Sequence, residues 1–188
     1  MVVTKNRTSD DVETLIQQNQ LIFGENKVQE AQKKFLNISN NRIKIHLIGP
    51  LQTNKVKIAL NLFDTIQSLD REKLIIEIAN HLNKNSEKIR TKNFFIQINI
   101  GQEEQKSGVA PESALALYQL ALINKLNVVG LMCIPPKNDD PKFYFKKMVE
   151  LKNKLNQNLK LSMGMSEDYL EALECGSDMV RIGSKIFQ

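Results

Sequence analysis

Three stretches of this sequence carry residue types that could do chemistry together. The first is Lys5, which ends the short apolar run at the N-terminus. A lysine amine in an enclosed site is a nucleophile that forms Schiff bases with carbonyl groups. The alternative is a solvated lysine on a frayed chain end. The hydrophobic pattern alone leaves both interpretations open.

The other two stretches are short loops rich in glycine, serine and methionine. SMGMS spans Ser162–Ser166, and RIGS spans Arg181–Ser184. Small residues let backbone N–H groups approach an anion, and Arg181 adds a fixed cation. The alternative is that these residues only form tight turns. An anion site opposite a Schiff-base lysine would suit a molecule with a phosphate and an aldehyde. Pyridoxal 5′-phosphate fits this description, and so does a phosphorylated sugar bound by a Schiff-base aldolase.

Alternating elements must position these residues. Strand-like stretches occupy residues 1–5, 21–26, 42–49, 62–69, 93–100, 127–134, 159–164 and 178–183. Helical stretches follow the first seven, at 9–20, 27–37, 52–61, 71–84, 111–125, 142–156 and 166–176. The regular alternation predicts a parallel sheet, and eight units predict a (β/α)8 TIM barrel. An open doubly wound sheet is the alternative, although no GxGxxG motif follows the first strand.

Local signals mark the ends of some elements and the mouth of the expected barrel. Ser9 is a candidate helix N-cap, and Gly176 a candidate C-cap. Chemistry in this fold lies at the C-terminal strand ends, and the loops after strands seven and eight usually bind phosphate. His46 could face the cavity, but we expect it to be packed and hydrogen-bonded. Lys106 could reach the site, but a loop charge is slightly favoured.

Composition excludes several function classes. The net charge is +5 and the isoelectric point about 9.1. The lysines are scattered over helical stretches, which favours solvated helix faces over nucleic-acid binding. No apolar run is long enough to span a membrane, and the N-terminus does not resemble a secretory signal. The two cysteines, Cys133 and Cys175, form no zinc-type spacing and are expected to be small buried hydrophobes. We expect one domain over residues 1–188 in the cytoplasm.

Several long blocks identify a family resemblance that runs nearly end to end. They are VVTKNR, FGENKVQEA, IHLIGPLQTNKVK, QINIGQEEQKSG, GLMCIPP and LSMGMSEDYLEALECGSDMVRIGSKIF. The chain resembles the pyridoxal phosphate homeostasis proteins, which are single-domain relatives of the alanine racemase barrel. The resemblance implies that pyridoxal phosphate is the cofactor, and it removes most of the weight from the aldolase alternative.

The resemblance also implies roles for individual residues. Lys5 would hold the cofactor as a Schiff base, Arg181 would face the pyridine nitrogen, and Asn26 would lie near the ring. The phosphate end would be bound by Ser166, Gly183 and Ser184, and lined by Ser162 and Met163.

The sequence departs from the family at several places, which include the shifted basic residue after Lys5 and Gln188 in place of a glycine. The helix that usually precedes the first strand is missing, so we expect an exposed apolar strip, with low thermal stability or self-association. Pro50 replaces a histidine of the family.

The resemblance implies a cofactor carrier and not an efficient catalyst. A cationic arginine at the ring nitrogen makes the cofactor a weak electron sink. Alanine racemases supply a second acid or base from a further domain. We therefore expect a protein that buffers or delivers pyridoxal phosphate to pyridoxal-phosphate-dependent apoenzymes, as a monomer or weak dimer. The runner-up is an enzyme with low amino-acid racemase activity.

Overall fold

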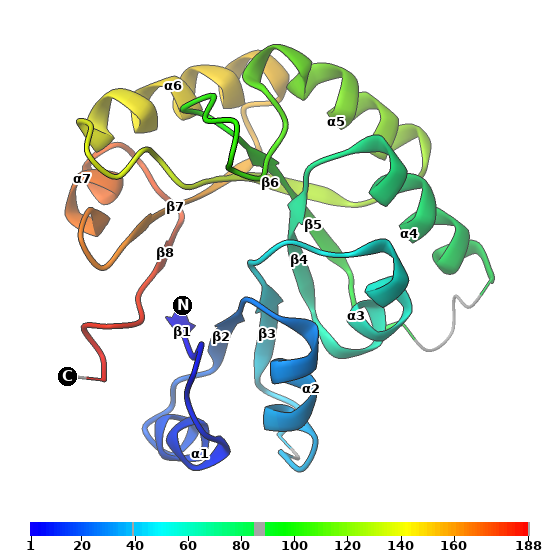
Figure 1. Ribbon diagram of the computed structural model, residues 1–188, viewed down its shortest axis with the longest axis vertical. Coiled ribbons are helices and arrows are strands. Elements are labelled where there is room, and N and C mark those ends of the chain that lie inside the picture. The colour runs from blue at the N-terminus through cyan, green and yellow to red at the C-terminus, as the bar shows by residue number, and fades with distance from the viewer. Residues whose placement is uncertain (39, 85–88, 188) are drawn as a thin grey trace.

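The protein is a closed barrel of eight parallel strands, seen in a computed structural model that describes residues 1–38, 40–84 and 89–187 (Figure 1). The strands pair in chain order, each with the next. They are β1 (Val2–Val3), β2 (Ile22–Glu25), β3 (Lys44–Leu47), β4 (Thr65–Leu69), β5 (Asn93–Ile98), β6 (Val128–Cys133), β7 (Lys160–Met165) and β8 (Met179–Arg181).

The first and last strands meet and close the barrel. Val2 forms a parallel bridge with Ile182. The Val3 N–H donates to the Ile182 carbonyl at 2.8 Å, and the Ile182 N–H donates to the Met1 carbonyl at 3.1 Å. The predicted (β/α)8 barrel is therefore confirmed, and the open doubly wound alternative is wrong.

In the part of the chain that the structure describes, seven α-helices cover the outside of the sheet, each after its strand (Figure 1). They are α1 (Ser9–Gln17), α2 (Val28–Phe35), α3 (Val56–Leu62), α4 (Glu72–Lys84), α5 (Ala114–Ile123), α6 (Pro141–Leu155) and α7 (Tyr169–Glu174). Short 3-10 turns at Thr53–Lys55 and Pro111–Ser113 precede α3 and α5. Within the described residues, none of the helices is long and apolar enough to cross a membrane.

Capping chemistry sets the ends of individual helices. The N-cap of α1 is Thr8, not the predicted Ser9, because Thr8 and Asp11 bond to each other's backbone N–H groups in a capping box. At the end of α7, the chain passes through Gly176 with a φ of +83°. A side chain is strained in this left-handed conformation, so glycine favours the stop. The C-cap itself is Cys175, and the predicted Gly176 is the left-handed residue that follows it.

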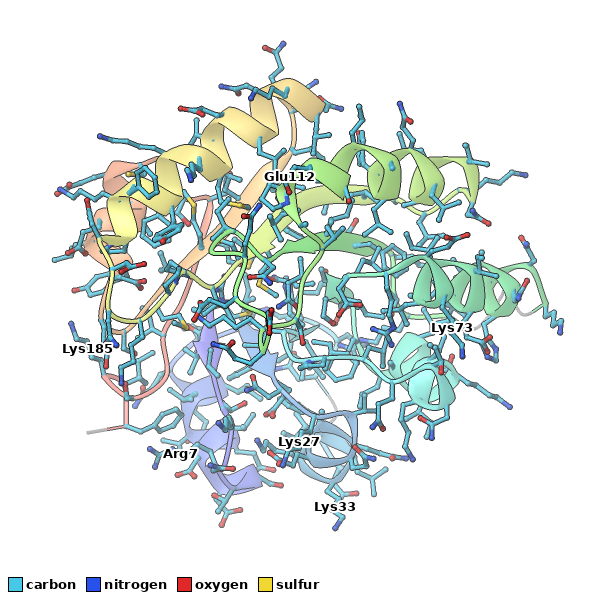
Figure 2. The ribbon with its side chains drawn as sticks, turned by 45° about the horizontal axis from the view of Figure 1, so that its top comes forward. Arg7, Lys27, Lys33, Lys73, Glu112 and Lys185 are labelled. Carbon is cyan, nitrogen blue, oxygen red and sulfur yellow. The ribbon has the colours of Figure 1, made fainter. Side chains whose placement is uncertain are left out.

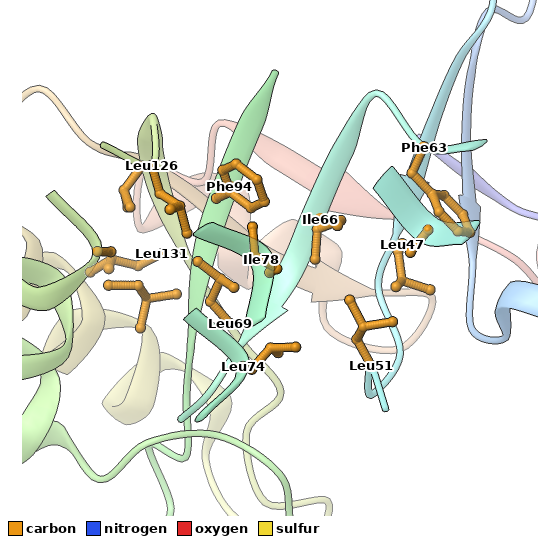
Figure 3. Close-up of a cluster of buried hydrophobic side chains, with 14 of the residues drawn as sticks. Leu47, Leu51, Phe63, Ile66, Leu69, Leu74, Ile78, Phe94, Leu126 and Leu131 are labelled. Carbon is orange, nitrogen blue, oxygen red and sulfur yellow. The ribbon is translucent and has the colours of Figure 1, made fainter. Parts of the chain in front are cut away.

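Apolar side chains fill the space between the barrel wall and the helices (Figure 3). In α4, Leu74, Ile75 and Ile78 lie on one face at helical spacing and are fully buried. They meet strand residues such as Ile66 and Phe94 (Figure 3). This packing holds the strands in place, and with them the residues that follow the strand ends.

Candidate functional site

A cavity of about 920 Å³ opens at the C-terminal ends of the strands. Its wall includes side chains or backbone from the ends of β1, β2, β3, β5, β6, β7 and β8. The β5–α5 loop contributes Gln105, Lys106 and Ser107. This is the end of the barrel at which the fold places its chemistry.

Five of the predicted site residues lie together in the wall of this cavity: Asn26, Ser166, Arg181, Gly183 and Ser184. The Gly183 N–H donates to the Ser166 hydroxyl at 3.4 Å, so the loops after β7 and β8 are in contact. A Cβ at Gly183 would lie 3.2 Å from the Val3 carbonyl oxygen. The β8 loop therefore packs closely against the end of β1.

The other two residues of the predicted phosphate end lie deeper. Ser162 and Met163 are fully buried and are not part of the cavity wall. The Met163 side chain belongs to the hydrophobic core. The Ser162 side chain instead accepts a hydrogen bond from Arg181, so it helps to hold that residue in place.

Arg181 is a buried charged residue of the cavity wall, and three hydrogen bonds hold its guanidinium group. Its side chain is 4% exposed, and it donates to the Ser162 carbonyl at 2.7 Å, the Ser162 hydroxyl at 3.0 Å and the Cys133 carbonyl at 2.7 Å. Burial lowers the pKa of the guanidinium from its ordinary value, yet an arginine stays charged at neutral pH. All three acceptors are neutral, and among the described residues no carboxylate forms a salt bridge with it.

A chain of buried polar groups runs from Arg181 into the barrel. The Ser162 hydroxyl donates to Gln67 Oε1 at 2.7 Å, and Gln67 Nε2 lies 2.9 Å from His46 Nδ1. Burial lowers the pKa of His46 to about 4, so the ring is neutral at pH 7. His46 is thus packed and hydrogen-bonded, as expected. Sequence reasoning missed Gln67, although a polar residue inside the buried strand TIQSL was a signal.

Lys5 lies two residues beyond the end of β1 and is exposed. It does not belong to the cavity wall, whereas Val3, two residues earlier, does. The chain turns at this point, because the Arg7 N–H donates to the Thr4 carbonyl at 3.1 Å and Asn6 has a φ of 59°. The Arg7 guanidinium lies 4.3 Å from the centre of the Phe187 ring, which brings the end of the chain beside this turn.

Lys106 reaches the cavity, contrary to the slight preference for a loop charge. Its ammonium group donates to the Pro135 carbonyl at 3.1 Å and forms an ion pair with Glu103. These contacts hold the β5–α5 loop against the loop after β6. Sequence spacing could not show this, because the two loops are distant in the chain.

Two further positions shape the site. A Cβ at Gly49 would lie 2.1 Å from the Asn26 carbonyl oxygen, so only glycine lets the loops after β2 and β3 approach this closely. Pro50, at the position of the family's histidine, lies in the cavity wall.

The cysteines are free thiols. Cys133 is fully buried, and burial raises its pKa to about 12, which confirms the expectation of an inert small hydrophobe. Cys175 is only half-buried. Within the described part of the chain, the His, Cys, Asp and Glu side chains form no group that could hold a metal ion.

Comparison with known proteins decides the family. The profile of the alanine racemase N-terminal domain family matches residues 6–188. The pyridoxal phosphate homeostasis protein of Pasteurella multocida is 40% identical over 200 residues, covering 100% of this chain and 84% of that protein. The protein of the same name from Haemophilus influenzae is also 40% identical, and 83% of it is covered. This chain belongs to the pyridoxal phosphate homeostasis protein family.

A solved structure of a homologue agrees with this assignment. PipY of Synechococcus elongatus PCC7942, with PLP bound, superposes with a TM-score of 0.86 at 28% identity. The match covers 100% of this chain and 92% of PipY. The resemblance to the pyridoxal phosphate homeostasis proteins that the sequence blocks indicated is therefore confirmed.

Proposed function

We propose that this protein binds pyridoxal 5′-phosphate in the cavity at the strand ends and acts in pyridoxal phosphate homeostasis, by buffering the cofactor or delivering it to pyridoxal-phosphate-dependent apoenzymes. The observation that carries the proposal is Arg181, a buried cation in the cavity wall with only neutral hydrogen-bond partners among the described residues. A buried charge without a counter-ion is costly. A ligand acceptor in the cavity would offset that cost.

The donor set around the cavity fits the cofactor. The loops after β7 and β8 place Ser166, Gly183 and Ser184 on one side, where small residues leave backbone N–H groups accessible to a phosphate. Arg181 would face the ring nitrogen, and Asn26 would lie near the ring. Ser162 would support Arg181 from below, while Met163 would pack behind the phosphate loop. When bound, the cofactor supplies an aldehyde and an electron-withdrawing ring.

Lys5 is the proposed Schiff-base lysine. Alternate residues of a strand share a face, and Val3 lies in the cavity wall. Lys5, two residues later, would therefore reach the same side when β1 extends by two residues.

Borohydride reduction followed by peptide mapping tests this function. The protein mixed with pyridoxal phosphate should gain a visible absorption band that Lys5→Ala lacks. Reduction should leave a pyridoxyl group on the peptide that contains Lys5. Lys106→Ala is the matched control and should keep the band. An adduct on another lysine would refute the assignment of Lys5, and no band in the unsubstituted protein would refute the function.

Lys106 supports the second candidate function, a weak amino-acid racemase. It brings a second amine to the cavity, from the β5–α5 loop. Its amine is engaged by Glu103 and by the Pro135 carbonyl, so it would have to break these contacts to act on a substrate. We therefore favour the carrier.

The remaining features of the proposal concern the whole chain. We propose a single domain over residues 1–188, whose last residue lies outside the described part. The free thiols are consistent with the reducing cytoplasm. We propose a monomer or weak dimer.

A further inference from the structure

One lysine of α2 is buried, although the sequence suggested that such lysines are solvated. Lys34 is 6% exposed, whereas its neighbour Lys33 is exposed and lies at the periphery of the molecule (Figure 2). The Lys34 ammonium group lies 2.5 Å from Glu25 Oε1 and 2.5 Å from the Thr4 carbonyl oxygen. Lys34 therefore joins α2 to the ends of β1 and β2.

Thr4 and Glu25 complete a buried group that we call the Thr4 cluster (Thr4, Glu25 and Lys34). Thr4 and Glu25 are both fully buried. The Thr4 hydroxyl donates to Glu25 Oε1 at 2.5 Å, so one carboxylate oxygen accepts two hydrogen bonds. The other oxygen, Oε2, is buried without a partner among the described residues.

The contact with the Thr4 carbonyl acts on Lys5 directly. That carbonyl belongs to the peptide group that joins Thr4 to Lys5, and the group is planar. The same oxygen also accepts the Arg7 N–H, while the Thr4 N–H donates to the Gly24 carbonyl at 3.1 Å. Two donors on its oxygen thus hold the peptide group that joins Thr4 to Lys5, and the preceding peptide group is tied to β2.

Packing alone does not account for this cluster. A buried ion pair contributes little to stability, because desolvation offsets the attraction, and apolar replacements are often neutral or stabilising. The pair lies between β2 and α2, where other side chains are apolar, such as Phe23 and Phe35, whose tilted rings lie 5.8 Å apart between centres. The feature that an apolar side chain could not supply is the strong donor to the Thr4 carbonyl.

We propose that Lys34, held by Glu25, is a positioning residue that fixes the backbone of Lys5 beside the cavity, two residues beyond the wall residue Val3, for Schiff-base formation. This inference rests on the proposed function. In the reaction the Lys5 amine attacks the aldehyde carbon, a C=N bond replaces the C=O bond, and the oxygen leaves as water. Lys34 takes no part in these bond changes; it sets the direction from which the amine approaches.

The test compares two similar ligands, of which only one can react with the Lys5 amine. Pyridoxal phosphate forms a Schiff base, whereas pyridoxamine phosphate has an amine in place of the aldehyde and binds without one. In Lys34→Met, the rate of appearance of the visible band should fall about tenfold or more, since misplacing a reacting group is costly. Affinity for pyridoxamine phosphate, measured by calorimetry, should stay within about twofold, because that ligand uses other contacts.

Two further variants keep the result interpretable. Lys33→Met removes an exposed lysine of the same helix and should behave as the unsubstituted protein does. Glu25→Gln combined with Lys34→Met avoids a lone buried carboxylate and should repeat the selective loss if Lys34→Met folds poorly.

Three outcomes would overturn the inference or its basis. An unchanged rate in Lys34→Met would show that Lys34 does not position Lys5. Equal loss of both ligands in Lys34→Met and in the double variant would show a purely structural role. Absence of the band in the unsubstituted protein would instead refute the proposed function.

Discussion

The Arg181 guanidinium donates to both the carbonyl and the hydroxyl oxygen of Ser162, and this contact fixes the direction of a whole hydrogen-bond chain. Arginine only donates, so the Ser162 hydroxyl accepts from Arg181 and donates its own hydrogen bond to Gln67 Oε1. Gln67 Nε2 then donates to His46 Nδ1. His46 therefore carries its single ring proton on Nε2.

Removing the Ser162 hydroxyl, which lies at the centre of this hydrogen-bond chain, should destabilise the folded protein. In Ser162→Ala, Gln67 Oε1 loses its donor and Arg181 loses one acceptor, both in a buried place. The free energy of unfolding should fall by about 1–3 kcal/mol, the usual cost of leaving buried polar groups unpaired. Urea denaturation measures it. Ser113→Ala, at an exposed serine, is the control; equal stability of the two variants would contradict the chain.

The neutral His46 should make stability depend on pH. Its folded pKa of about 4 lies below the unfolded value of about 6.5, so the unfolded state binds the proton more tightly. The stability that the neutral ring contributes is complete above pH 6.5 and is lost as the pH falls from 6.5 to 4. The loss should be about 3 kcal/mol. Unfolding titrations over this range measure it.

A comparison of the two histidines isolates this effect. His46→Gln should flatten the pH dependence between 4 and 6.5. His81→Gln is the matched control, because His81 lies on α4 beside Glu77, outside the buried chain of Gln67 and Ser162. A profile that His46→Gln does not alter would mean that another group causes the loss.

The phosphate end should depend on Ser166. Its hydroxyl accepts the Gly183 N–H in the structure and faces the cavity wall. Ser166→Ala should weaken pyridoxal phosphate binding about tenfold or more, since a hydrogen bond to a charged group contributes about 1.5–3 kcal/mol. A fluorescence or absorbance titration gives the affinity, and circular dichroism checks the fold. Unchanged affinity would place the phosphate elsewhere.

Catalysis should be slow even with the cofactor bound. Among the described residues, the cavity wall contains no tyrosine or histidine that could act as a second acid or base. Correct placement of such a group accelerates reactions about 10²–10⁴-fold. Incubation with L-alanine in deuterated water should show little Cα exchange or D-alanine by NMR and chiral chromatography. Turnover of about 1–10³ per second would contradict the carrier function.

The sequence was informative where a local pattern and the fold agree. Alternating apolar runs predicted all eight strands, and the loops at Ser166 and Gly183 were placed correctly at the barrel mouth. The helix start was misassigned by one residue, because Ser9 and Thr8 are both good caps and only the bond to Asp11 selects Thr8.

Contacts between segments that are distant in the chain could not be predicted from the sequence. Lys34 looks like any helical lysine, and its burial depends on Glu25 and Thr4 lying opposite it in the folded barrel. Gln67, Ser162 and His46 come from three strands, so their chain of bonds exists only after the barrel closes. The reach of Lys106 to Pro135 depends likewise on the packing of two loops.

The seam between β1 and β8 has a consequence for how the molecule is made. Its backbone bonds join Val3 to Ile182, so a ribosome must synthesise the whole segment between these residues before the barrel can close. Val3 and Gly183 flank the seam and also belong to the cavity wall. The cofactor pocket is thus the last part of the barrel to be completed during translation. A ligand that contacts both sides of the seam stabilises the closed barrel. At a concentration a hundredfold above its dissociation constant, it raises the free energy of unfolding by about 2.7 kcal/mol.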